Sequence, residues 1–144
     1  MKVKLKQADI WFSKCIRERS NWTCERCGKY YPTKETRGLE CSHFHSRAKW
    51  GVRFDPINCE ALCTGCHMYL GGNPYIHNEE RLIRNGQEAL DRLLIRANSQ
   101  NLGRLAKRAE SDIAKHYKQQ FSIMQSKRIE GEIGRIEFEE FKLI

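Results

Sequence analysis

Residues 63–70, CTGCHMYL, repeat a cysteine spacing that occurs once earlier in the chain, in CERC. In each pair the two cysteines are separated by two residues, so a tight turn can point both thiolates at one ion. The pairs predict a closed structural zinc site, with thioredoxin-like redox chemistry or ordinary buried cysteines as the alternatives. The expected zinc ligands are Cys24, Cys27, Cys63 and Cys66.

The 35 residues between the pairs are more than a compact zinc ribbon uses, so we expect the ion to clamp an inserted hairpin, loop and strand. KYY, after the first pair, is strand-like, and a second strand enters at Leu39, so a hairpin between these two is the simplest assignment. INCEAL predicts a further short strand, and CTGCHMYL opens a helix that stops at Pro74. The predicted order is therefore strand, long loop, strand, helix.

Helices are expected on both sides of this region. Asp9 can cap a helix that runs to about Arg19. Downstream, EERLIRNGQEALDRLLIRANS carries an apolar stripe of helical spacing, which Asn85 and Gly86 divide into two pieces. A further helix is predicted over residues 111–126.

The 144-residue chain suits one domain with an extension rather than two ordinary domains. We divide it into a zinc-braced core (1–77), a basic helical extension (78–128) and a tail (129–144). The tail alternates between apolar and acidic residues, and an edge strand, a partner-binding arm and a disordered segment all remain open for it.

Charge is unevenly distributed along the chain. The net charge is +8, but the tail contributes −3, which leaves +11 on residues 1–128. Such a balance favours a polyanionic partner, although a solvated basic surface explains it as well. The N-terminal MKVKLKQADIW lacks the apolar run of a signal peptide, and no window approaches eighteen apolar residues. We therefore expect a cytosolic protein without membrane contact, with reduced cysteines.

The sequence between and after the cysteine pairs contains LECSHFHSR, then Asn58 in RFDPINCEALC, then His67 directly after the last cysteine. These residues resemble the HNH, or ββα-metal, endonuclease motif in the form braced by two CxxC pairs. Within that superfamily the chain is most similar to the bacteriophage NinG/Rap recombination proteins, through RFDPIN, CTGCHMYLGGNP, LIRNGQEALDRL and IAKHYKQQF. The likeness covers roughly residues 9–125. It implies an α+β fold with a small ββα-metal nuclease core, an N-terminal helix and a C-terminal helical extension.

The resemblance also implies a DNA endonuclease, acting in the cytosol of a phage-infected bacterial host. Hydrolysis of a phosphodiester needs a base that deprotonates water, and a divalent ion, here Mg²⁺ or Mn²⁺, that holds the phosphate. By position in the motif, His43 is that base, Asn58 orients the loop and His67 binds the ion. The plainer alternatives are a core histidine or an extra zinc ligand for His43, a turn asparagine for Asn58 and a polar residue at a helix start for His67.

One position departs from the HNH pattern. The residue before the base is often Asp or His and binds the metal, but here it is Ser42, whose hydroxyl is a poor ligand for a hard cation. His45 is weighed as the missing ligand, as a phosphate contact, or as a residue without a chemical role. Asp55 is a further substitute.

Basic residues in two segments are candidates to neutralise DNA phosphates. Trp50, in the loop, either stacks on an exposed base or packs the loop onto the core. The basic candidates are Arg47, Lys49 and Arg53 in the loop between the strands, and Arg104, Lys107, Arg108, Lys115 and Lys118 in the helical extension.

No base-reading element is evident in the sequence. The resemblance, rather than composition, implies a preference for branched DNA such as D-loops and Holliday junctions, and symmetric cutting of a junction would favour a homodimer. Two alternatives remain. One is a sequence-preferring HNH nicking or homing enzyme, and the other is a zinc-stabilised DNA-binding protein without activity.

Overall fold

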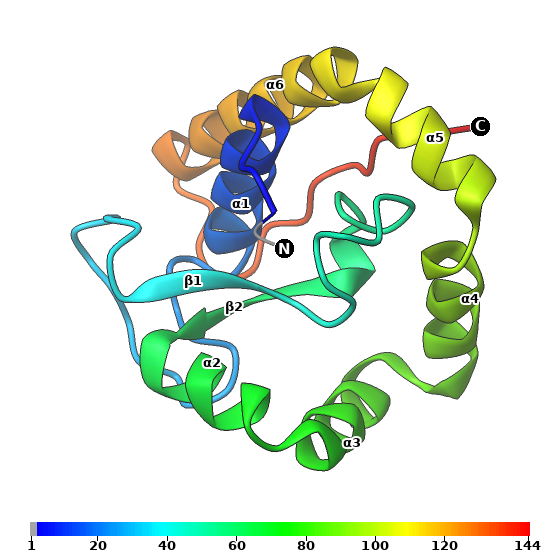
Figure 1. Cartoon of the computed structure of the whole chain (residues 1–144). Helices are drawn as coiled ribbons and strands as arrows, with labels where there is room; N and C mark the ends of the chain where they lie inside the picture. Colours follow the sequence, from blue (N-terminus) through cyan, green and yellow to red (C-terminus); the bar gives the residue numbers. More distant parts are fainter. Residues whose placement is uncertain (1–2) are drawn as a thin grey trace.

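The computed structural model describes residues 3–144, so the first two residues of the expected core lie outside the described residues. The described chain is α+β, with six helices around one two-stranded sheet (Figure 1). Strand β1 (Leu39–His43) leads through a long loop and the short 3₁₀ helix η1 (Pro56–Asn58) to strand β2 (Cys59–Cys63). Helix α2 (Thr64–Gly71) follows β2 directly. The predicted order of strand, long loop, strand and helix is confirmed.

The predicted hairpin partner of β1 is wrong. KYY forms no strand and contributes only an isolated bridge between Thr23 and Tyr30. Instead, β1 pairs antiparallel with β2, in a register that places His43 opposite Cys59. β2 is the buried segment, with Ala61 fully buried against 52% exposure for Tyr30, so its pairing with β1 places the sheet in the apolar core.

Two helices distant in sequence pack along each other above the sheet. They are α1 (Gln7–Arg19) and α6 (Glu110–Ile129), and the sequence placed α6 at residues 111–126 (Figure 1). The predicted start of α1 is corrected, since Asp9 lies inside the first turn and accepts a 2.8 Å bond from the backbone N–H of Lys6. The helix end at Arg19 is as predicted.

The remaining helices form an arc from α2 to α6 (Figure 1). They are α3 (Pro74–Asn85), α4 (Gln87–Ala97) and α5 (Gln100–Arg108). The predicted break after Asn85 is confirmed, and Gly86 adopts φ +84°, which glycine tolerates without strain. No described helix has both the length and the apolar character needed to cross a membrane.

Buried ion pairs hold the arc against the sheet. Glu60 of β2 is 3% exposed and faces α3, where it pairs with Arg81 at 3.4 Å and with Arg84; the Nε2 of His77 lies 3.7 Å from its Oε1. A carboxylate this deeply buried needs such partners to offset its desolvation. The helical extension is thereby fixed to the strand that leads into α2.

The C-terminal residues 130–144 form no regular secondary structure, so the edge-strand alternative is not observed. They nonetheless pack on the helices. Ile136 is 3% exposed and donates its backbone N–H to the Arg19 carbonyl at 3.2 Å, while the N–H of Phe141 reaches the Tyr117 hydroxyl at 3.0 Å. The three segments divided by sequence therefore share one apolar core.

Arg53, a predicted DNA contact, is an internal structural residue. Its side chain is 1% exposed and grips Asp9 with two bonds, Nε to Oδ1 at 2.9 Å and Nη2 to Oδ2 at 2.6 Å. Its guanidinium also lies 4.2 Å from the centre of the Trp50 ring. Arg53 is thus committed to fixing the loop on α1 and is not free to bind a phosphate.

Replacing Arg53 with Ala is expected to lower the free energy of unfolding by about 3–5 kcal/mol, because it leaves the Asp9 carboxylate buried and unpaired. Chemical denaturation at constant zinc concentration measures this loss. The matched control is Arg92→Ala, which removes an exposed pair with Glu88 and should cost about 0.5 kcal/mol or less. Equal losses in the two variants would contradict a structural role for Arg53.

Candidate functional site

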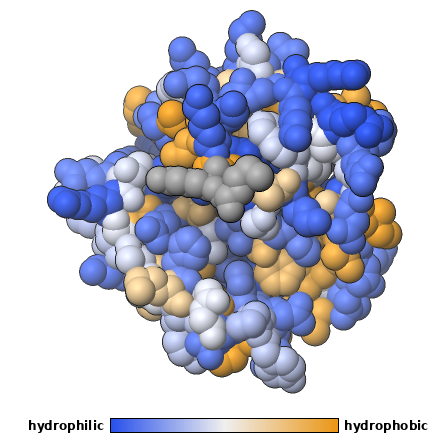
Figure 2. Space-filling view, in the orientation of Figure 1, coloured by the Kyte–Doolittle hydropathy of each residue, from blue (hydrophilic) through white to orange (hydrophobic). Residues whose placement is uncertain are grey.

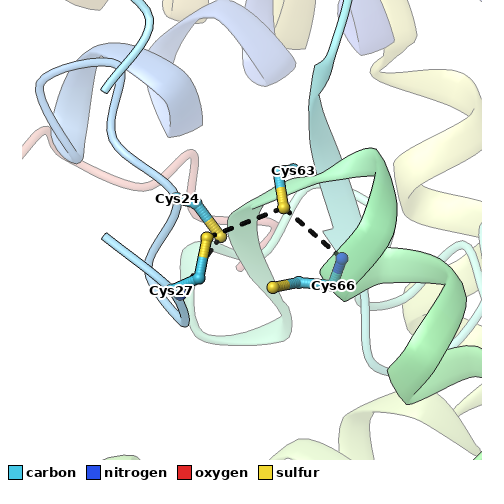
Figure 3. A group of neighbouring side chains, drawn as sticks. All are labelled: Cys24, Cys27, Cys63 and Cys66. Atoms are coloured by element: carbon cyan, nitrogen blue, oxygen red, sulfur yellow. Dashed lines mark hydrogen bonds between the residues drawn. The ribbon is translucent and has the colours of Figure 1, made fainter. Parts of the chain in front are cut away.

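Four cysteines bring their sulfur atoms together where β2 meets α2 (Figure 3). Cys24 and Cys27 come from the turn after α1, and Cys63 and Cys66 from the start of α2. All four Sγ atoms lie within 4.8 Å of one another, and those of Cys27 and Cys63 are 3.8 Å apart. Zn–S bonds of about 2.3 Å at tetrahedral angles place two sulfurs about 3.8 Å apart. The cysteine cage therefore fits a structural zinc ion.

Local backbone geometry prepares the cage for a metal. The Sγ of Cys24 accepts the backbone N–H of Cys27 at 3.5 Å, and the Sγ of Cys63 accepts that of Cys66 at 3.4 Å. Burial raises the pKa of Cys24, but backbone hydrogen bonds outweigh it and lower this pKa to about 7. A redox site of the thioredoxin kind needs only one cysteine pair, so the convergence of two pairs favours metal binding.

A cleft of about 290 Å³ opens along the unpaired edge of β1. It lies between α1, which contributes Asp9 and Arg17, and α2, which contributes His67. Glu40 and Cys41 of β1 and Arg47 of the following loop also line it; we call this feature the β1-edge cleft.

Glu40 and His67 form a carboxylate–imidazole pair in the β1-edge cleft. Their Oε1 and Nδ1 atoms are 2.8 Å apart, and both side chains are about two-fifths exposed, at 42% and 40%. His67 lies in the first turn of α2, one residue after the zinc-cage cysteine Cys66, so the cage fixes its position. Carboxylate oxygen and imidazole nitrogen are both common ligands for divalent ions.

His43 lies at the end of β1 on the opposite face of the strand. Its ring packs 6.4 Å from that of Phe12 in α1, and its Nε2 is 3.0 Å from the Arg53 carbonyl oxygen. Burial first, and then the charge of Arg47, lower the pKa of His43 to about 4. The ring is therefore neutral at pH 7. Because a carbonyl oxygen only accepts, Nε2 carries the hydrogen and Nδ1 is left with a free lone pair.

Asn58 ties the ends of the long loop together. It is fully buried, and its Oδ1 accepts the backbone N–H of His45 at 2.8 Å. Its Nδ2 donates to the carbonyls of His45 at 2.9 Å and of Val52 at 3.0 Å. These three bonds fix the chain immediately after His43.

The two candidates for the second metal ligand, His45 and Asp55, make other contacts in the structure. Within residues 3–144, no hydrogen bond or ion pair joins His45 to Glu40 or His67, and the His45 ring packs instead against Phe44 at 5.0 Å. Asp55 is committed to Arg96 of α4 at 2.5 Å and to the Ile57 backbone N–H at 2.9 Å. Asp55 is therefore not available as a metal ligand.

The predicted basic segments meet on one surface. Lys49 and Trp50 of the loop line a hollow together with Arg104 and Lys107 of α5, and the Lys107 amine lies 5.8 Å from the Trp50 ring centre. The indole also packs against Phe54 at 5.8 Å, so it anchors the loop. Further along, α5 and α6 present three more exposed basic side chains, and hydrophilic residues cover most of the face in Figure 2. These three are Arg108, Lys115 and Lys118.

Sequence reasoning missed Glu40 and Arg17. Strand alternation held a signal for Glu40, since residues two apart on a strand share a face and Ser42 occupies the weak metal position. The structure adds that the Ser42 hydroxyl is buried and has no hydrogen-bond partner among the described residues. Arg17 carried no comparable signal, because only the folded helix places it against β1.

A scan against models of protein families, a search of curated proteins and a search of solved structures each find no match. The likeness to the HNH motif therefore rests on the quoted residues alone.

Proposed function

We propose that the protein is a zinc-braced, metal-dependent DNA endonuclease of the HNH type. The observation that carries this proposal is the Glu40–His67 pair in a cleft that also contains Arg17 and Arg47. The Nε–H of Arg17 is buried and lacks a hydrogen-bond partner within the described residues, and the Nε of Arg47 lies 3.9 Å from Asp9 Oδ1, beyond hydrogen-bond distance. Ligands for a divalent ion thus adjoin two guanidinium groups, a residue type that suits a phosphodiester.

The residues divide the chemistry among them. Glu40 and His67 would hold Mg²⁺ or Mn²⁺, which when bound polarises the phosphate and stabilises the leaving 3′ oxygen. Neutral His43 accepts a proton from water at Nδ1, and the resulting hydroxide attacks phosphorus as the bond to the 3′ oxygen breaks. Asn58 holds the loop next to His43, and it acts on position rather than on the bond.

DNA is the expected partner because exposed basic residues extend from the loop along α5 and α6. Contacts with phosphates bind DNA without reading its sequence. The preference for branched recombination intermediates comes from the resemblance to the NinG/Rap proteins, as does the suggestion of a homodimer that cuts a junction symmetrically.

A second candidate function is a zinc-stabilised DNA-binding protein without activity. The observation that favours it is the placement of His43 on the α1 face of β1, whereas Glu40 and His67 meet on the α2 side. This alternative predicts tight, salt-sensitive binding of DNA without metal-dependent cleavage.

Replacing Glu40 with Gln is expected to raise the Mn²⁺ concentration needed for half-maximal cleavage by about tenfold or more, the usual loss for a weakened metal site. His67→Ala should act in the same direction. Titration of cleavage with Mn²⁺ measures both, and Glu79→Gln, which alters an exposed carboxylate of α3, is the matched control. Equal metal requirements in Glu40→Gln and Glu79→Gln would remove Glu40 from the site.

A further inference from the structure

A second group of potential metal ligands lies on the α1 face of the sheet. One ligand atom from each of Cys41, His43 and Cys59 lies within 4.8 Å of the other two. The two thiols are almost inaccessible, at 7% and 1% exposed. None of the three belongs to the cysteine cage.

The strand register explains why these side chains converge. His43 lies directly opposite Cys59, and Cys41 precedes His43 by two residues. Residues two apart, and residues directly opposite, project from the same face of an antiparallel pair. The grouping therefore follows from the hairpin itself, not from the rotamer of one mobile side chain.

His43 is already oriented as a metal-binding histidine. Its Nε2–H donates to the Arg53 carbonyl at 3.0 Å, which leaves the Nδ1 lone pair for an ion. Histidines that bind metals commonly donate their other ring N–H to a carbonyl or a carboxylate in this way. The Arg53 carbonyl is itself held in place by the buried ion pair with Asp9.

Charge and access also suit a cation. Two thiolates and one divalent ion sum to zero, so the filled site places no net charge among buried residues. Arg17 and Arg47 line the same cleft as Cys41, and their positive charges favour its thiolate form. Because Cys41 borders this cleft, water can reach a fourth coordination position.

We propose that Cys41, Cys59 and His43 form a second metal site, which takes Zn²⁺ or a similar thiophilic divalent cation with water as the fourth ligand. The site is separate from the cysteine cage. An ion bound here uses the Nδ1 of His43, so its binding withdraws the base and inhibits cleavage. This inhibition rests on the proposed function, whereas the site does not.

The test is metal content under reducing conditions. Reduced protein that carries one equivalent of Zn²⁺, enough to fill the cysteine cage, is titrated with further Zn²⁺ or Co²⁺, and bound metal per chain is measured by mass spectrometry and by the cobalt–thiolate absorption. Wild type is expected to bind two ions through thiolates, the second of them counted by the cobalt–thiolate absorption. Cys41→Ser and Cys59→Ser are expected to bind one, and Cys15→Ala, which alters a fully buried cysteine outside both groups, should bind two.

His43→Gln keeps both thiols and is also expected to bind one ion tightly, and circular dichroism shows that each variant is folded. A wild-type protein with a single thiolate-bound ion, or a folded Cys41→Ser that still has two, would overturn the second site. DNA cleavage is followed in parallel, and the second equivalent of Zn²⁺ should lower the cleavage rate of the wild-type protein. If wild type binds two ions but does not cleave DNA at any zinc level, the second metal site stands and the proposed nuclease function is wrong. Failure of the site and failure of the proposed function therefore give different results.

Discussion

Replacing Cys24 or Cys63 with Ser is expected to unfold the protein at room temperature. Structural zinc in small domains contributes about 10–16 kcal/mol of binding free energy, and folded domains have only about 5–15 kcal/mol of net stability. The cage joins the turn after α1 to the junction of β2 and α2, so its loss frees the end of the sheet where Leu39 pairs with Cys63. Circular dichroism and thermal denaturation measure the effect.

Cys15→Ala is the control for this prediction. Cys15 is fully buried and lies outside both cysteine groups, so its loss should lower the melting temperature without abolishing folding. Chelation of zinc from wild type should reproduce the serine variants. A chain that keeps its native melting temperature after complete removal of zinc would refute a structural role for the cage.

Replacing His43 with Ala is expected to slow DNA cleavage by about 10²–10⁴-fold, the usual contribution of a general base. Affinity for DNA should change little, because the basic side chains proposed to contact phosphates are on the loop, α5 and α6. Single-turnover cleavage and equilibrium binding measure the two quantities. Zinc is limited to one equivalent, so that the second site stays empty.

His45→Ala is the matched control for His43. His43 ends β1 and His45 lies two residues later in the loop, but the hydrogen bonds of His45 to Asn58 run through its backbone, which the substitution keeps. Its cleavage rate should therefore stay within about tenfold of wild type, since no proton transfer is removed. Cleavage by His43→Ala at the wild-type rate would show that the base lies elsewhere.

The parts of the fold that were predicted correctly from the sequence rest on short local patterns. The repeated cysteine spacing identified all four members of the cage, and the Asn85–Gly86 pair marked the boundary between α3 and α4. In both cases a few adjacent residues set the geometry, through a tight turn or a positive φ.

The features that the sequence did not predict depend on contacts between residues far apart in the chain. From the sequence Arg53 is only a basic residue in a loop. In the structure it is buried, because its guanidinium forms two hydrogen bonds with Asp9, 44 positions away. Glu40 passed unnoticed because its meeting with His67 depends on the packing of α2 across β1. Pairing of β1 with β2 rather than with KYY likewise depends on which strand is buried, and no short segment encodes that.

The measurement that tests the account most directly is cleavage of labelled four-way junction, flap and linear duplex DNA by the wild-type protein. Each substrate is incubated with Mg²⁺, Mn²⁺ or EDTA, and the zinc content is held at one equivalent. An HNH endonuclease of the proposed kind should cut only with the added metal, and fastest on branched DNA. Tight binding to all three substrates, with no cutting under any metal, would contradict it and leave a zinc-stabilised DNA-binding protein.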